Sequence, residues 1–335
     1  MNRTNNARKF RLKGLSVLFV LGFLLLLGAF FSLGVGANYL TPLQVLDVLS
    51  GKETDVSFIV EQYRIPRVIV AMLAGAGLAM SGVILQGIIR NPLASPDVIG
   101  INKGAGLAAV VILVVVTDLP IGLLPVFAFA GAVLVAVILL ALSYKTGGRP
   151  VMFALIGLAL GAVCQAGIEY IIVRNPMTAN STLIWLAGSL HGRGWDEATI
   201  LLPWLILLTP ICILLSGWLD VLSLGDEVSL GLGLRVKLAR QVLLLLAVSL
   251  AGVCVAAVGT IGFLGLIAPH MARKICSGKH RLLLPAAGML GALILLLADM
   301  LGRGVNPPME IPAGIVTAVI GGPYFLFLLL RQRKQ

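Results

Sequence analysis

The chain has 335 residues, of which 59% are hydrophobic and only 12% are charged, with 25 Lys and Arg against 14 Asp and Glu. A soluble protein carries roughly twice that charged fraction, so an ordinary water-soluble globular domain is excluded. Apolar runs of about 20 residues, the length that crosses a bilayer, recur along the chain. The sequence therefore predicts an all-α polytopic membrane protein.

About ten transmembrane helices are predicted. They lie near residues 15–37, 67–89, 99–117, 121–143, 151–173, 199–219, 239–258, 262–275, 283–300 and 312–330. The first run is longer than the apolar part of a signal peptide, which is about 7–15 residues, so we interpret it as an uncleaved span. This predicts a basic N-terminal segment (1–14), one membrane domain (15–330) and a short tail (331–335).

The distribution of positive charge predicts the orientation. With these spans, eighteen of the 25 Lys and Arg lie on the side of the two termini, six lie on the other side, and Lys103 is ambiguous. Because basic loops stay in the cytoplasm, both termini are predicted to be cytoplasmic. The net charge of +11 then reflects membrane topology, and no nucleic-acid partner is predicted.

Two segments interrupt the apolar pattern. Between the second and third spans, residues 90–100 read RNPLASPDVIG, and two prolines four positions apart cannot continue a helix. Irregular backbone at membrane depth is tolerated only where protein covers it or where it lines a watery cavity. Residues 219–238 form the longest predicted cytoplasmic connection, and their leucines and acidic pair indicate either a docking surface or an ordinary solvated loop.

The fifth span carries Gly157, Gly161 and Gln165 on one face, which indicates close helix packing with a polar group turned inward. Glu169 follows near the outer end of this span. The outer loop after it predicts a short amphipathic helix near 183–190, with Trp185 and Trp195 at the membrane interface.

Several motifs resemble one family. Gly225-Asp226-Glu227 followed by Gly233 is similar to the ATPase-coupling segment of ABC importer permeases. Further matching motifs are Arg64-x-Pro66-Arg67, Asn91-Pro92-Leu93-Ala94 with Pro96, Gly262-Phe263-Leu264-Gly265-Leu266 running to Pro269-His270-x-x-Arg273, Ala298-Asp299, and Ile311-Pro312-x-Gly314. They resemble, in order and over nearly the whole chain, the iron-siderophore and vitamin B12 permease family (FecCD-type), with the 269–273 motif closer to the siderophore branch.

The resemblance implies a ten-helix type II importer subunit that pairs with a second permease subunit, identical or paralogous. It also implies a cytoplasmic ABC ATPase dimer, an extracytoplasmic substrate-binding protein, and a ferric siderophore as cargo, with cobalamin or haem as the alternative. The implied site residues fall into three groups. They are Gly225, Asp226, Glu227, Gly233 and Arg235 for ATPase coupling, Arg64, Arg67 and Arg303 for binding-protein docking, and Asn91, Pro92, Leu93, Thr146 and Gln165 for the gate and pathway.

The sequence lacks the residues that other functional classes require. An ion-coupled secondary transporter needs ionisable groups within the membrane, and apart from Glu169 the predicted spans contain almost none. There is no H-E-x-x-H, no G-x-S-x-G and no G-x-x-x-x-G-K-[ST] phosphate loop, so neither an intramembrane enzyme nor an ATPase site is predicted. The four cysteines and three histidines show no metal-ligand spacing, and no metal or cofactor is expected.

Overall fold

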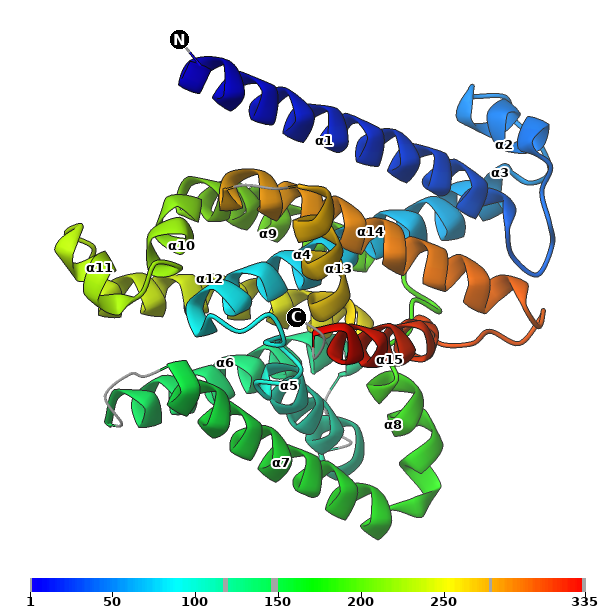
Figure 1. Cartoon of the computed structure of the whole chain (residues 1–335). Coiled ribbons are helices and arrows are strands. Elements are labelled where there is room, and N and C mark those ends of the chain that lie inside the picture. The colour runs from blue at the N-terminus through cyan, green and yellow to red at the C-terminus, as the bar shows by residue number, and fades with distance from the viewer. Residues whose placement is uncertain (1, 117–119, 146–149, 277–278, 333–335) are drawn as a thin grey trace.

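The structure, a computed structural model, describes residues 2–116, 120–145, 150–276 and 279–332, which are mostly helical and contain no strand (Figure 1). Within these described residues, seven helices are long and apolar enough to cross a membrane. They are α1 (Asn2–Gly34), α4 (Ile65–Ile89), α6 (Leu124–Lys145), α7 (Pro150–Arg174), α9 (Trp195–Leu214), α12 (Val236–Val258) and α14 (His280–Gly304). The predicted all-α polytopic class is confirmed.

Three further helices of the described residues account for the other predicted spans. They are α5 (Ile101–Val110), which continues as a π-helical turn (Val111–Val115), α13 (Leu264–Ile275) and α15 (Ala313–Gln332). The predicted short eighth span corresponds to α13, whose last turn carries Arg273 and Lys274.

The apolar span of α1 is Gly14–Gly34, which agrees with the predicted start near 15, and the helix itself begins earlier, at Asn2. One predicted boundary is wrong. The predicted sixth span, 199–219, is divided at Leu215 into α9 and α10 (Ser216–Leu222). Pro210 removes a backbone donor near the end of α9, and the Ser216 hydroxyl donates to the Ile213 carbonyl, which competes with helix hydrogen bonding.

Short helices join the spans. An unpredicted α2 (Pro42–Leu49) starts with a capping box between Thr41 and Gln44, and α3 (Ser57–Ile59) leads through a π-helical turn (Val60–Arg64) into α4. A short helix is present in the predicted outer loop as α8 (Ala179–Leu186), four residues earlier than the predicted 183–190. Its Trp185 is only 8% exposed, so the prediction of a surface aromatic is wrong there, whereas Trp195 is exposed.

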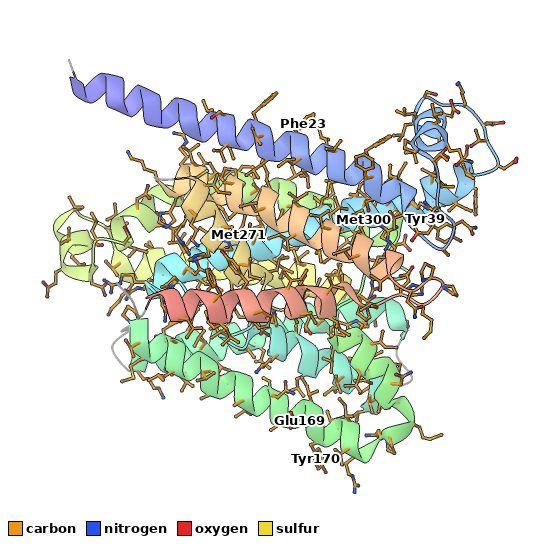
Figure 2. All side chains as sticks on the ribbon, turned by 45° about the vertical axis from the view of Figure 1, so that its right-hand side comes forward. Phe23, Tyr39, Glu169, Tyr170, Met271 and Met300 are labelled. Carbon is orange, nitrogen blue, oxygen red and sulfur yellow. The ribbon has the colours of Figure 1, made fainter. Side chains whose placement is uncertain are left out.

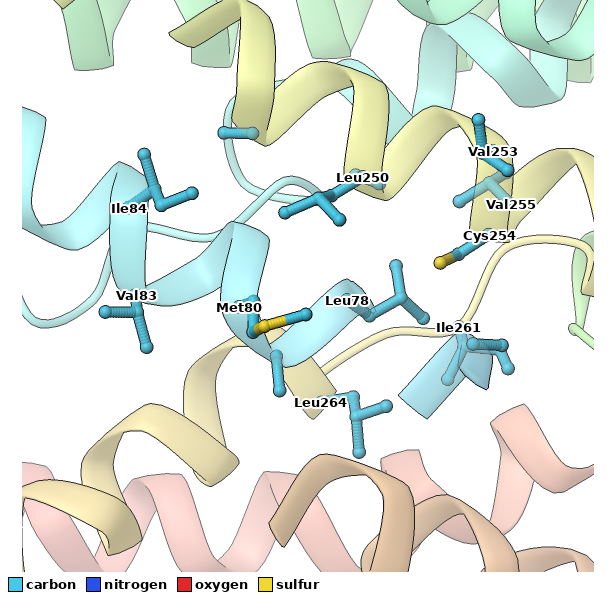
Figure 3. Close-up of a cluster of buried hydrophobic side chains, with 14 of the residues drawn as sticks. Leu78, Met80, Val83, Ile84, Leu250, Val253, Cys254, Val255, Ile261 and Leu264 are labelled. Atoms are coloured by element: carbon cyan, nitrogen blue, oxygen red, sulfur yellow. The ribbon is translucent and has the colours of Figure 1, made fainter. Parts of the chain in front are cut away.

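Helix α4 lies at the centre of the bundle and packs against α14, α12, α13 and α9. In Figure 3, Leu78 of α4 lies close to Leu250 and Cys254 of α12. Met80 of α4 instead lies beside Gly288 of α14. The α4–α13 contact depends on small residues, because a Cβ on Gly82 would overlap the Gly265 carbonyl oxygen. Such close backbone approach is the usual way in which helices associate within a bilayer.

The bundle has two ends. One carries α10, α11 (Asp226–Gly231) and the start of α1, and the other carries α2 and α3 (Figure 1). We call these the α11 end and the α2 end. Helix α1 lies along α14 on the outside of the bundle, and its exposed Phe23 projects away from it, as an apolar side chain facing lipid would (Figure 2).

Candidate coupling surface and translocation cavity

Residues 219–238 form a compact knob rather than a loose loop. Gly225 has a φ of 104° and Gly233 a φ of 82°, values that side-chain-bearing residues rarely adopt, and these two glycines bracket α11. The buried Ser229 hydroxyl donates to the Val221 carbonyl oxygen at 2.9 Å and to the Gly225 carbonyl oxygen at 2.6 Å. These bonds fold α11 back against the end of α10.

Asp226 connects this knob to two transmembrane helices. Its Oδ1 accepts a hydrogen bond from Arg90 Nη2 at 2.9 Å and another from Arg240 Nη2 at 2.7 Å. Arg90 is the C-cap of α4 and the first residue of the irregular 90–100 segment, and Arg240 lies in the second turn of α12. A displacement of α11 therefore acts through charge-assisted bonds on the end of α4.

The outward surface of the knob is apolar. Four aliphatic side chains here are between 49% and 63% exposed: Leu224, Val228, Leu230 and Leu232. Glu227 and Arg235 are exposed beside them. A protruding apolar patch with charged residues near it is typical of a protein interaction site.

A second polar contact connects the knob to the bundle. Asp220 of α10 accepts hydrogen bonds from the backbone N–H of His280, at 2.9 Å, and from its ring Nδ1, at 2.7 Å. This contact holds α10 against the first residue of α14, which packs on α4. The sequence indicated no role for His280, because the two residues lie 60 positions apart.

The irregular 90–100 segment leaves α4 at the α11 end and turns back into the bundle. Arg90 has a left-handed backbone, and Asn91 Oδ1 accepts a hydrogen bond from the Leu93 N–H at 2.9 Å, which fixes the turn. Asn91 and Pro92 are exposed, whereas Ala94 and Ser95 are buried. The part that re-enters the bundle is covered by protein. Irregular backbone at membrane depth is tolerated where protein covers it in this way. The predicted companion, Thr146, lies outside the described residues.

A cavity of about 560 Å³ lies between α5, α7, α8 and the link from α12 to α13. Gln165 lines it, and its Nε2 donates to Glu169 Oε1 at 2.9 Å. Glu169 lies on α7, away from the α4 core (Figure 2). Lys103 and Thr260 also line the cavity.

We expected Glu169 to be almost the only ionisable group in the predicted spans, and the structure shows that this expectation is wrong. Lys103 of α5 and Asp97 of the irregular segment also line the cavity, and Asp299 is buried in α14. Asn102, which is 2% exposed, presents an Oδ1 with no hydrogen-bond partner among the described residues. The cavity is therefore polar on the side of α5.

The arginines predicted for docking lie near the α2 end, but two of them are buried rather than displayed. Arg64 is 7% exposed, and it donates to the Leu33 and Asn38 carbonyl oxygens, each at 2.6 Å. Arg303 is 4% exposed and donates to the Val35 carbonyl oxygen at 2.8 Å. Both guanidinium groups thus lie at the C-terminal end of α1, where carbonyls lack helix partners and cations are favoured.

Arg67 is the centre of an ionic network. It contacts Asp299 Oδ1 at 2.7 Å and Glu310 Oε2 at 2.8 Å, and Arg303 Nε lies 3.0 Å from Asp299 Oδ2. Partial burial by itself raises the pKa of Glu310, but hydrogen bonds and charge from Arg67 and His191 outweigh it and hold that pKa below its usual value. The network joins α4, α14 and the loop before α15.

Comparisons with known proteins show the family of this chain. The FecCD transport family matches residues 24–331. The chain belongs to this family. It is 51% identical, over the full length of both proteins, to the Fe(3+)-citrate import system permease protein YfmE of Bacillus subtilis. It is 45% identical to the Fe(3+) dicitrate transport system permease protein FecD of Escherichia coli, with 82% of this chain and 86% of that protein covered.

A solved structure shares the fold. A metal-chelate type ABC transporter in an inward-facing conformation superposes with a TM-score of 0.83 at 31% identity, covering 95% of this chain and 99% of that one. The family likeness identified Asp226 from sequence but not its partners. Arg90 lies 136 positions away from it, and nothing local in the sequence indicates that pairing.

Proposed function

We propose that this FecCD family member is the membrane-spanning subunit of an ABC importer that carries a ferric chelate, with ATP hydrolysed by a separate subunit. The observation that carries the proposal is the Asp226 bridge, which connects the exposed knob to the end of α4 where the irregular segment begins. A separate motor requires such a connection, because force applied at a docking surface has to reach the passage.

The proposed motor dimer docks on the apolar surface of α11 and its flanking residues, Leu224, Leu230 and Leu232, with Gly225 and Gly233 setting the shape of the knob. Nucleotide-driven movement of the knob then displaces Arg90 and the Asn91-Pro92-Leu93 turn, which acts as a gate. Thr146 is proposed as the companion of this gate. The transport step needs no covalent chemistry on this chain.

The proposed cargo passes along the cavity that Gln165 lines. Lys103 supplies a cation there, and Asn102, Gln165 and Thr260 supply amide and hydroxyl groups, which suit an oxygen-rich chelate. The relatives named above carry ferric citrate, so a ferric citrate-type siderophore complex is the first candidate for this chain. The described cavity has walls from one chain, and we propose that a second permease subunit completes the passage.

The proposed orientation places both termini and the α11 end in the cytoplasm and the α2 end outside the cytoplasmic membrane, as the excess of Lys and Arg indicates. A binding protein then docks on the α2 end. The buried Arg64 and Arg303 support this surface by holding the end of α1, and Arg67 holds the loop of Glu310, so the three arginines act by positioning the docking face.

The test is transport by the reconstituted complex. The permease is placed in liposomes with its ATPase and binding protein, and accumulation of radioactive ferric citrate is measured with ATP present inside or outside the vesicles. We expect uphill uptake only when ATP reaches the ATPase, and none with an ATPase variant that lacks its phosphate-loop lysine. Uphill uptake by the permease alone, driven by a proton or sodium gradient, would contradict the proposal. Haem and cobalamin serve as competing cargoes.

A further inference from the structure

A second cavity, of about 460 Å³, lies at the α11 end between α6, α7, α11 and α12. Its lining includes the apolar Leu140, Phe153 and Val236. It also includes the basic Arg235, Lys237 and Arg240. A pocket lined by both apolar and cationic side chains suits an amphiphile rather than a small soluble ion.

The charge of this pocket is positive. Among the described residues that line it, Asp226 is the one acidic residue, and it already contacts Arg240 and, outside the lining, Arg90. Helix α12 begins at Val236 without a side-chain N-cap, so its first N–H groups add a further positive pole. Phosphate groups bind readily where cationic side chains and a helix N-terminus meet.

The pocket also lies at a defined depth. Ser143 is the last residue of the apolar span of α6, Phe153 lies in the first turn of the span of α7, and Val236 opens the span of α12. Three membrane spans thus end around the cavity. This is the level at which lipid headgroups meet acyl chains, and basic pockets between helices at this level bind anionic headgroups.

We propose that this pocket binds one anionic phospholipid of the adjacent leaflet. The phosphate lies against Arg235, Lys237 and the N-terminus of α12, and an acyl chain passes along Leu140 and Phe153. A bound lipid here touches α11 and α12 at once, and so stabilises the knob against the bundle. The assignment depends only on the pocket and holds whichever cargo the protein carries.

The test compares lipid binding to two double variants of the full chain in detergent, by native mass spectrometry with added phosphatidylglycerol or phosphatidylcholine. Arg235→Gln with Lys237→Gln removes two positive charges from the pocket. Lys279→Gln with Arg281→Gln removes two exposed charges from the same end, outside the pocket lining. At about 1 kcal/mol per basic residue near anionic lipid, the first variant should bind phosphatidylglycerol about thirty-fold more weakly. The control should bind it like the parent.

Equal binding by both variants, or equal binding of the two lipids by the parent, would overturn the proposal. Displacement of phosphatidylglycerol by millimolar inorganic phosphate would also overturn it, because the site would then serve a soluble anion.

A second measurement leaves Arg235 and Lys237 unchanged. Leu230→Cys places a thiol at the exposed rim of the pocket, and the four native cysteines are buried, so a bimane label attaches there. Brominated phosphatidylglycerol should quench this label more than brominated phosphatidylcholine, and equal quenching would count against a lipid site.

Discussion

The Asp226 bridge allows a quantitative prediction for Asp226→Ala. The side chain is 37% exposed, its partner Arg90 is 32% exposed and its partner Arg240 is 14% exposed, so solvent weakens both contacts. Exposed ion pairs contribute about 0.2–1 kcal/mol each, and the Arg240 contact, being less exposed, belongs at the upper end of that range. Together the two contacts contribute about 1.5 kcal/mol to the linked arrangement, which corresponds to a change of about tenfold in its equilibrium constant.

The assay is the ratio of cargo moved to ATP hydrolysed by the reconstituted complex. Because the apolar docking surface is untouched, Asp226→Ala should keep ATP hydrolysis and lower this ratio about tenfold. The matched control is Arg281→Ala, which removes an exposed charge from the first turn of α14, at the same end of the bundle as Asp226. An unchanged ratio in Asp226→Ala would refute the linkage. Adding Arg90→Ala to Asp226→Ala should lower the ratio little further, because the two residues share one contact.

Two further predictions concern packing and charge. Gly82→Ala should lower the unfolding temperature of the detergent-solubilised protein, because the new Cβ overlaps the Gly265 carbonyl and overpacking costs about 1–3 kcal/mol or more. Gly22→Ala, where no atom lies within 4 Å of the new Cβ, should be neutral or slightly stabilising, and equal effects would argue against the α4–α13 contact. Glu310 has a lowered pKa beside Arg67, so its stabilising effect is present above the unfolded pKa of about 4.3 and is lost as pH falls through the lower folded value. Thermal unfolding below about pH 4.3 should therefore depend on pH less steeply in Glu310→Gln than in the parent protein, and parallel curves would contradict this.

The membrane spans could be predicted from sequence because the bilayer acts on each segment separately. A stretch of about 20 apolar residues crosses hydrocarbon whatever its neighbours are, and backbone groups in lipid have to bond within the helix. The division of the sixth span at Leu215 was missed, since both parts are apolar and only local hydrogen bonding separates them.

The exposure of the arginines near the α2 end could not be predicted from the sequence. The family resemblance implied outward-facing cations, but Arg64 and Arg303 are buried against carbonyls at the end of α1, at positions 31 and 268 residues away. Whether a cation is exposed depends on which helix end lies beside it. That arrangement is a property of the packed bundle.

The sequence by itself determined that this is a polytopic helical protein with an irregular segment after α4 and a long polar connection before α12, because hydropathy and the turn preferences of proline and glycine act locally. The tertiary structure alone decided that Asp226 contacts Arg90 and Arg240, that Lys103 and Gln165 share a cavity, and that a basic pocket lies where three spans end. These groups are brought together by helix packing between distant segments, and spacing along a chain does not encode proximity across a bundle.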